Sequence, residues 1–196
     1  FYRSAKIQKY IHITTIIPTL IVNIGASFIS LQHLKPQDNM LSVLIPVKNF
    51  DCSKLIKKLH KQGKTLDCPY EIIVAEDGTD SSMLHMNAVA DKLTNCRRIV
   101  KDINIGRAAI RNLLASEARY RSLIFMDCDA VVEKKDFLKV YADALKKSKI
   151  VCGGLYHADE LPNKECTLRY RYEKEADKTR DARTRNKAPY DRFTSF

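Results

Sequence analysis

Short apolar runs that alternate with segments of helical periodicity constrain the fold of this chain more than any other feature. The runs cover residues 41–45, 71–75, 98–101 and 122–126, and a fifth begins at residue 150. The segments between them repeat leucine and isoleucine at helical spacing, as in Leu55, Ile56 and Leu59. Strands that are apolar on both faces and alternate with helices predict an α/β fold built on a doubly wound, mostly parallel sheet with flanking helices.

Residues that interrupt strands or helices predict the boundaries of these elements. Pro46 is expected to end the first strand, because proline cannot donate a hydrogen bond to a neighbouring strand. The helical segments are expected at residues 52–62, in a stretch that ends near residue 93, and at residues 105–118 and 136–147. We place the core domain at residues 40–160 and expect it to be incomplete at its C-terminal side.

The two ends of the chain differ from this core. From Ile11 to Leu31 the sequence has no Lys, Arg, Asp or Glu, and about 20 apolar residues suffice to span a bilayer. Polar residues such as Asn23 dilute that stretch, so we expect residues 1–39 to be a leader outside the domain. Upstream read-through, a disordered segment and a membrane segment all fit such a leader, and an added structural element is a further alternative. Residues 161–196 alternate charges and are expected to form a loop or helix that leads into a missing second half.

Charge and cysteine usage narrow the class of protein. The formal net charge of +11 is spread along the chain and favours an anionic partner such as a phosphate or a membrane surface. Nucleic acid is not expected as a partner, because basic residues interleaved with aromatic ones and zinc-finger spacings are both missing from the sequence. The six cysteines never form a C-x-x-C pair, which is typical of reduced thiols and favours a cytoplasmic location. Peripheral association with the inner face of a membrane is compatible with this charge.

Polar residues follow the expected strands at the point where each one ends. They are the segments 46–49, 76–80, 102–107 and 127–129. Because the carboxyl ends of parallel strands meet at one edge of a sheet, we expect these residues to lie together where α/β proteins bind ligands. Any single segment is weak evidence, since an acidic residue such as Asp77 serves equally well to cap the following helix.

Two pairs of charged residues in these segments indicate a chemistry. Asp127 and Asp129 are two residues apart, so on an extended chain both carboxylates face one site. Such oxygen ligands suit Mn²⁺ or Mg²⁺ bridged to a diphosphate. Arg107 and Arg111 lie one turn apart near the start of their helix, where a phosphate is favoured. Surface arginines that are merely solvated explain that second pair equally well.

The four segments together resemble the successive motifs of glycosyltransferase family 2. The resemblance covers about residues 41–155 and is carried by the ordered motifs Ser42–Asn49, Ile72–Thr79, Asn104–Asn112 and Phe125–Asp129. It implies a GT-A (Rossmann-like) fold and the transfer of a sugar, with inversion, from a nucleoside-diphosphate sugar to a glycan or lipid-linked acceptor.

The resemblance also implies roles for individual residues. Pro46, Val47 and Lys48 would lie beside the nucleotide base, and Asp77 with Gly78 would meet the edge of that base. Asp127 would lie near the ribose or the sugar, and Asp129 would bind the metal ion. Family members usually carry an aromatic residue at the position of Lys48, so the identity of the nucleotide stays open.

Inversion by direct displacement needs a general base within hydrogen-bond reach of the acceptor hydroxyl. The resemblance implies an acidic residue in the second half of the domain, and we expect it beyond Phe196, with Asp159 and Glu160 as weak candidates. A donor-binding fragment without turnover and a nucleotidyltransferase remain alternative interpretations. A dinucleotide-binding oxidoreductase is disfavoured because the first strand is not followed by the motif G-x-G-x-x-G.

Overall fold

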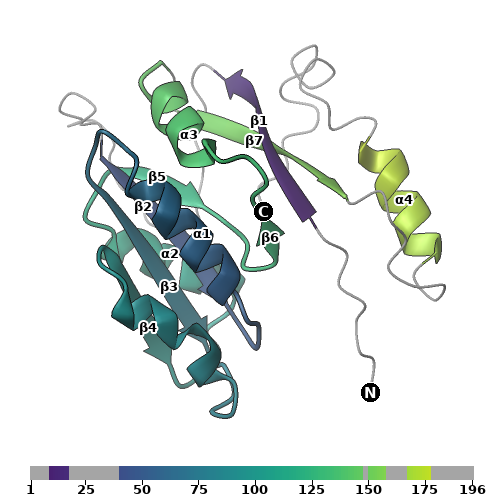
Figure 1. Ribbon diagram of the computed structural model, residues 1–196. Coiled ribbons are helices and arrows are strands. Elements are labelled where there is room, and N and C mark those ends of the chain that lie inside the picture. The colour runs from purple at the N-terminus through teal and green to yellow at the C-terminus, as the bar shows by residue number, and fades with distance from the viewer. Residues whose placement is uncertain (1–8, 18–39, 148–149, 158–166, 178–196) are drawn as a thin grey trace.

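A four-stranded parallel sheet forms the centre of the molecule (Figure 1). The computed structural model describes residues 9–17, 40–147, 150–157 and 167–177. The strands of the sheet are β2 (Leu41–Val47), β3 (Tyr70–Asp77), β4 (Cys96–Lys101) and β5 (Ser122–Phe125), in the order β4-β3-β2-β5. The chain passes from β2 to β3 and β4 on one side and then returns to β5 on the other side. The predicted doubly wound α/β fold is therefore confirmed, and its topological switch point lies between β2 and β5.

Helices cover both faces of this sheet. They are α1 (Ser53–Gly63), the 3-10 helix η2 (Leu84–Lys92) and α3 (Phe137–Leu145) on one face, and α2 (Arg107–Glu117) on the other. Successive side chains of β2 point to opposite faces of the sheet. Val43 and Ile45 pack in the hydrophobic cluster that includes α1, whereas Leu44 packs against α2. Both faces of the sheet are thus buried, which explains why its strands read as continuous apolar runs.

The second helical stretch is present as the 3-10 helix η2, which ends at Lys92. One predicted boundary needs correction. Strand β2 continues through Pro46 to Val47, although the sequence predicts that Pro46 ends it. Leu44 accepts a hydrogen bond from the N–H of Met126 (3.0 Å), and Pro46, two residues on, directs its backbone to the same side. The ladder with β5 has ended there, at the Leu44–Phe125 pair, so the missing N–H of Pro46 leaves no partner unsatisfied.

A second sheet lies beside the first. It consists of β6 (Ala130–Val131), β1 (Lys9–Ile17) and β7 (Ile150–His157), in the order β6-β1-β7. The fifth strand expected from residue 150 is thus present as β7, but it pairs antiparallel with β1 and does not extend the parallel sheet. Helix α4 (Thr167–Asp177) contacts β7. The domain boundaries expected after residues 39 and 160 stay predictions.

Within the described ranges, no helix combines the length and the hydrophobicity that a membrane crossing requires.

Candidate functional site

The carboxyl ends of β2, β3, β4 and β5 meet at one edge of the parallel sheet, and the polar segments identified in the sequence follow them. In open α/β sheets, ligands bind outside these strand ends, near the switch point. The candidate site is therefore formed by the loops that follow these four strands.

Asp77, the last residue of β3, is a buried carboxylate that holds the loop after β4. Its Oδ1 accepts a hydrogen bond from the backbone N–H of Ile105 (2.7 Å), and its Oδ2 accepts one from the N–H of Gly106 (3.1 Å). The side-chain amide of Asn104 also donates to Oδ2 (3.0 Å) and to the backbone carbonyl of Asp77 (3.0 Å). Asp77 thus fastens the segment that leads into α2, and it is only 5% exposed.

Two glycines make this close approach possible. Gly78 has a φ of +65°, and a Cβ atom at this position would lie 2.5 Å from the backbone nitrogen of Asn104. Gly106, the residue before α2, has a φ of +91°, a conformation that glycine adopts without steric cost. The motif Asn104–Gly106 is therefore a tight loop that brings the start of α2 to the end of β3.

The loops after β2 and β3 are also locked together. Asn49, with a φ of +49°, accepts a hydrogen bond from the N–H of Asp80 (2.8 Å) and donates its amide to the carboxylate of Asp80 (3.0 Å). Below this pair, the buried carboxylate of Glu76 accepts hydrogen bonds from Thr79 (2.6 Å) and Asn87 (2.9 Å). These contacts give the loops after β2 and β3 a defined shape.

On the other side of the switch point, Asp127 follows β5 and pairs with α2. The Nη2 atom of Arg111 lies 2.7 Å from Oδ1 of Asp127. Both side chains are partly exposed, at 17% for Arg111 and 36% for Asp127. The pair therefore lies at the surface of the site, where an incoming anion or cation can compete for either partner.

Cys128 anchors the turn that carries Asp127 and Asp129. It packs against the core cluster of α1, and burial raises the pKa of its thiol to about 11, with Asp129 and then Asp127 adding to the effect. A hydrogen bond from the backbone of Lys48 to the thiol opposes this rise in pKa. The turn after β5 is thus tied to the end of β2, and Cys128 is partly buried between two carboxylates that are also of intermediate exposure.

The carboxylates of Asp127 and Asp129 fit a metal ion that arrives together with a diphosphate. Within the described residues, no group of three or more His, Cys, Asp or Glu side chains forms a site able to hold a metal alone. Mg²⁺ is usually bound through one or two carboxylates and the phosphates of a substrate. Oδ1 of Asp127 is engaged by Arg111, so a metal ion at this turn would share Asp127 with that arginine.

The remaining predicted residues lie around this edge. Pro46 is half-buried and Val47 is buried at the end of β2, while Lys48 is exposed just beyond it. Arg107 is exposed at the first position of α2 and offers its backbone carbonyl to Arg111 (3.3 Å). The weak base candidates, Asp159 and Glu160, lie outside the described residues.

The sequence interpretation missed the contacts that fasten these loops. Asn104 was part of a recognised motif, but its hydrogen bonds to Asp77 were not expected. Asn49 and Asp80 were likewise not singled out as a pair. Asn or Gly in a loop is the signal that the sequence offers for such positions, because these residues tolerate a positive φ best.

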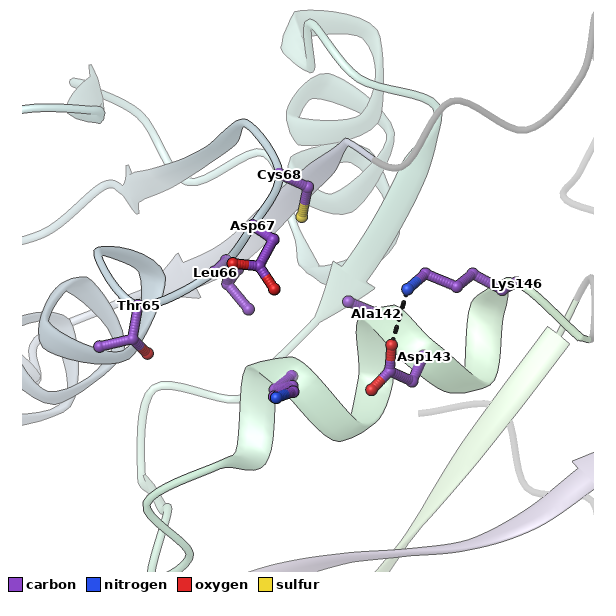
Figure 2. A pocket seen from close by; sticks show the side chains of 8 residues that line it. Thr65, Leu66, Asp67, Cys68, Ala142, Asp143 and Lys146 are labelled. Atoms are coloured by element: carbon purple, nitrogen blue, oxygen red, sulfur yellow. Dashed lines mark hydrogen bonds and ion pairs between the residues drawn. The ribbon is translucent and has the colours of Figure 1, made fainter.

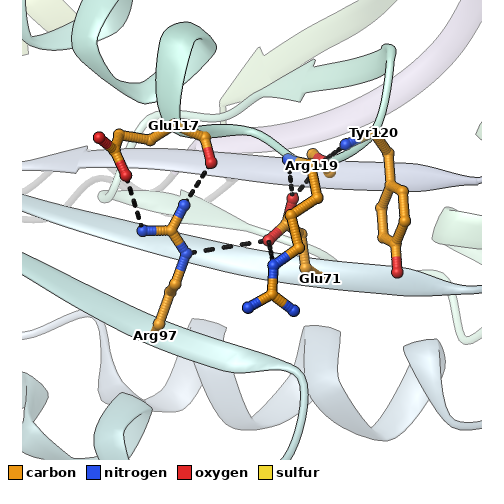
Figure 3. A network of polar contacts seen from close by, with 6 residues as sticks. Glu71, Arg97, Glu117, Arg119 and Tyr120 are labelled. Atoms are coloured by element: carbon orange, nitrogen blue, oxygen red, sulfur yellow. Dashed lines mark hydrogen bonds and ion pairs between the residues drawn. The ribbon is translucent and has the colours of Figure 1, made fainter.

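Two other polar features lie at the opposite, amino-terminal edge of the sheet. A hollow between the loop after α1 and helix α3 is lined by residues such as Asp67, Cys68 and Lys146 (Figure 2). Glu71, near the start of β3, accepts hydrogen bonds from Ser42 (2.7 Å) and from the backbone of Arg119 (2.6 Å), with Arg97 nearby (Figure 3). This network ties three strands and the loop after α2 together, and it lies away from the strand ends that form the candidate site.

Comparisons with known proteins give the following matches. The profile of the family described as "Glycosyl transferase family 2" matches residues 42–195. No curated protein matches the chain. Among solved structures, matches include S. aureus TarS 1–349 (TM-score 0.45), the same chain in complex with UDP-GlcNAc (0.45) and in complex with UDP (0.44), each 24% identical. They cover 53% of this chain and 31%, 30% and 31% of those chains, so this chain spans less than a third of their length. A likeness of this degree carries no conclusion about activity or substrate.

Proposed function

Since this chain belongs to glycosyl transferase family 2, we propose that it binds a nucleoside-diphosphate sugar at the carboxyl edge of its parallel sheet. The sugar is transferred, with inversion at the anomeric carbon, to a glycan or to a lipid-linked acceptor. The observation that carries the proposal is the Arg111–Asp127 ion pair at the switch point between β2 and β5. It brings a cation suited to phosphate and a carboxylate suited to a metal ion to one place.

The donor is bound through groups on both sides of that switch point. Pro46, Val47 and Lys48 lie beside the base, and Asp77 with Gly78 meets its edge. A carboxylate accepts about four hydrogen bonds, and Asp77 receives three from the loop, so it retains room for one from a base.

The diphosphate is held at the start of α2 and at the turn after β5. Arg107 and Arg111 contact phosphate oxygens there, where the N-terminus of a helix also favours an anion. Asp129 and Asp127 would hold Mn²⁺ or Mg²⁺, and the ion would supply positive charge to neutralise the departing nucleoside diphosphate. When the diphosphate is bound, Arg111 is shared between Asp127 and the phosphates.

The transfer itself is a direct displacement at the anomeric carbon. The acceptor hydroxyl attacks as the bond to the diphosphate oxygen breaks, and its proton passes to a carboxylate base. We expect that base beyond Phe196, with Asp159 and Glu160 as the weaker candidates within the chain. The donor site described above therefore positions the leaving group, while the proton acceptor belongs to the acceptor side.

A turnover assay tests this proposal. The chain is incubated with a panel of nucleoside-diphosphate sugars, Mn²⁺ and glycan or lipid-linked acceptors, and release of nucleoside diphosphate is measured. Where the general base is present, we expect release that requires metal, a product of opposite anomeric configuration by NMR, and loss of activity in Asp129→Asn. With the base beyond Phe196, residues 1–196 alone should show metal-dependent donor binding that is lost in Asp129→Asn. The matched control is Asp136→Asn, because Asp136 is exposed and its side chain makes no cap hydrogen bond.

Other results of this assay would distinguish the alternative functions. Metal-dependent donor binding without any release would identify a donor-binding fragment without turnover. Release of pyrophosphate from a nucleoside triphosphate and a sugar phosphate would identify a nucleotidyltransferase. Neither binding nor release with any donor would overturn the proposal.

A further inference from the structure

The exposed face of α1 consists of lysines. Lys54, Lys57, Lys58 and Lys61 follow one another at intervals of three, one and three residues, opposite the buried side chains of Leu55, Ile56 and Leu59. All four lysines are exposed, and Lys64 extends the row past the end of the helix. The helix has no Asp or Glu.

Helix α3 lies on the same side of the sheet as α1 (Figure 1). Five lysines are exposed on α3 or next to its ends, namely Lys134, Lys135, Lys139, Lys146 and Lys147. They outnumber the exposed acidic residues there, which are Glu133, Asp136 and Asp143, the last paired with Lys146. Gln62 of α1 joins the two helices, because it accepts a hydrogen bond from the N–H of Leu138 (3.0 Å) and donates one to the carbonyl of Lys134 (2.7 Å). Gln62 is buried, so the two rows of lysines are held in a defined relation.

The lysines of α1 are not explained by contacts within the protein. In the part of the chain that the structure describes, none of Lys54, Lys57, Lys58 and Lys61 forms an ion pair. Like charges three or four residues apart destabilise a helix, and Lys54 also lies in the first turn, where the helix dipole disfavours a cation. This arrangement therefore costs stability in isolation, and an anionic surface outside the chain would compensate for it.

The chemistry of the surface favours a lipid bilayer over a nucleic acid. Arginine, which recognises single phosphates through its planar fork, lies elsewhere: the described arginines are on β4, α2, the loop after α2, and α4. The large hydrophobic side chains that are exposed in the described residues, such as Ile103 and Phe125, also lie away from α1 and α3. A surface of lysines without exposed aromatic rings suits the diffuse negative charge of lipid headgroups better than it suits stacking on bases.

We propose that the lysine face formed by α1 and α3 docks the protein reversibly on an anionic phospholipid bilayer. The docking is electrostatic, without insertion of apolar side chains, and it is therefore sensitive to salt. The proposal is independent of the donor site, because none of these lysines belongs to it.

The experiment is co-sedimentation of the full chain with extruded vesicles. Vesicles of phosphatidylcholine alone are compared with vesicles of phosphatidylcholine and phosphatidylglycerol (70:30), in low and in high salt. The test variant is Lys57→Gln/Lys58→Gln, and the matched control is Arg121→Gln/Arg171→Gln, which removes two exposed positive charges elsewhere. Lys54→Gln/Lys61→Gln is a second test variant in case the first is poorly folded.

We expect binding to the anionic vesicles only, abolished by high salt. Each α1 variant should lower the partition coefficient by about 30-fold and the control by much less, from about 1 kcal/mol per lysine at the membrane surface. No binding to anionic vesicles in low salt, or equal effects of test and control variants, would overturn the proposal. Tighter binding of a DNA or RNA oligomer through the same lysines would overturn it in favour of a nucleic acid. The affinity for nucleoside diphosphate with Mn²⁺, measured by titration, should be unchanged in these variants. A failure of the membrane proposal is thereby distinguished from a failure of the donor-site proposal.

Discussion

Arg111 on α2 and Asp127 after β5 form an ion pair of 2.7 Å across the switch point of the parallel sheet. The two residues are separated by 16 positions in the sequence and come from opposite sides of the crossover between α2 and β5. In the proposed site, Arg111 pairs with Asp127 alone when no donor is bound. When the donor binds, Arg111 also contacts the diphosphate. Its guanidinium is suited to that exchange, because it can face two anions at once.

Replacing Arg111 tests this shared role. Arg111→Lys keeps the charge but loses the planar fork, so we expect the affinity for nucleoside diphosphate with Mn²⁺ to fall about tenfold. The free energy of unfolding should fall by about 1 kcal/mol or less, because the pair is partly exposed to solvent. Arg119→Lys, at an exposed arginine away from the site, is the control. An unchanged affinity in Arg111→Lys would remove Arg111 from the phosphate site.

Asp77 is expected to stabilise the loop after β4 through its hydrogen bonds. Asp77→Asn places an amide N–H₂ group opposite the N–H of Gly106 or of Ile105, where a carboxylate oxygen now accepts. We expect a loss of about 2 kcal/mol in the free energy of unfolding, measured by urea denaturation, and faster amide exchange at both residues. Asp102→Asn, at the exposed start of the same loop, should change neither quantity. Equal exchange rates in the two variants would contradict the role assigned to Asp77.

Gly78 and Gly106 provide a test substitution and its control. At Gly78 a Cβ atom would meet the backbone of Asn104 at 2.5 Å, whereas at Gly106 it would meet no atom within 4 Å. Both have a positive φ, so alanine at either position costs about 1–3 kcal/mol of backbone strain. Only Gly78→Ala should also displace the loop and weaken donor binding. Similar donor affinities in the two alanine variants would show that the loop tolerates the displacement.

His60 is expected to make stability depend on pH. It is buried beside Tyr70, whose hydroxyl lies 3.1 Å from Nδ1, and burial followed by the charge of Lys64 lowers the pKa of His60 below its usual 6.5. The unfolded chain then binds more protons than the folded chain below about pH 6.5, so stability is lost as the pH falls through that range.

The measurement is urea unfolding between pH 7.5 and 5. We expect His60→Gln to flatten the pH dependence, whereas His85→Gln, at an exposed histidine, should leave it unchanged. A pH dependence that persists in His60→Gln would show that other groups cause it.

Much of the fold follows from local patterns, and the site does so only in part. The apolar runs of β2 and β3 predicted a parallel sheet because these strands are buried on both faces. Pro46 was misjudged because its effect depends on where the neighbouring strand β5 stops, which local sequence does not encode. The pairing of β7 with β1 joins segments more than a hundred residues apart in the numbering, so no local periodicity predicts it.

The candidate residues of the site were identified, but their mutual contacts were not. Arg111 and Asp127 were both assigned to the nucleotide sugar, while their ion pair depends on how α2 crosses to β5. Asp77 was interpreted as a contact to the base, and the structure adds its three hydrogen bonds to a loop 27 to 29 residues later. Such contacts depend on tertiary packing, which is why a motif predicts the kind of site better than its internal bonds.

Calorimetric titration with nucleoside diphosphates, with and without Mn²⁺, is the decisive test of the metal-bound diphosphate. We expect binding that requires the metal, is lost in Asp129→Asn and is retained in Asp136→Asn. Binding that does not depend on Mn²⁺, or that is unaffected by Asp129→Asn, would contradict the assignment of Asp127 and Asp129 to a metal-bound diphosphate.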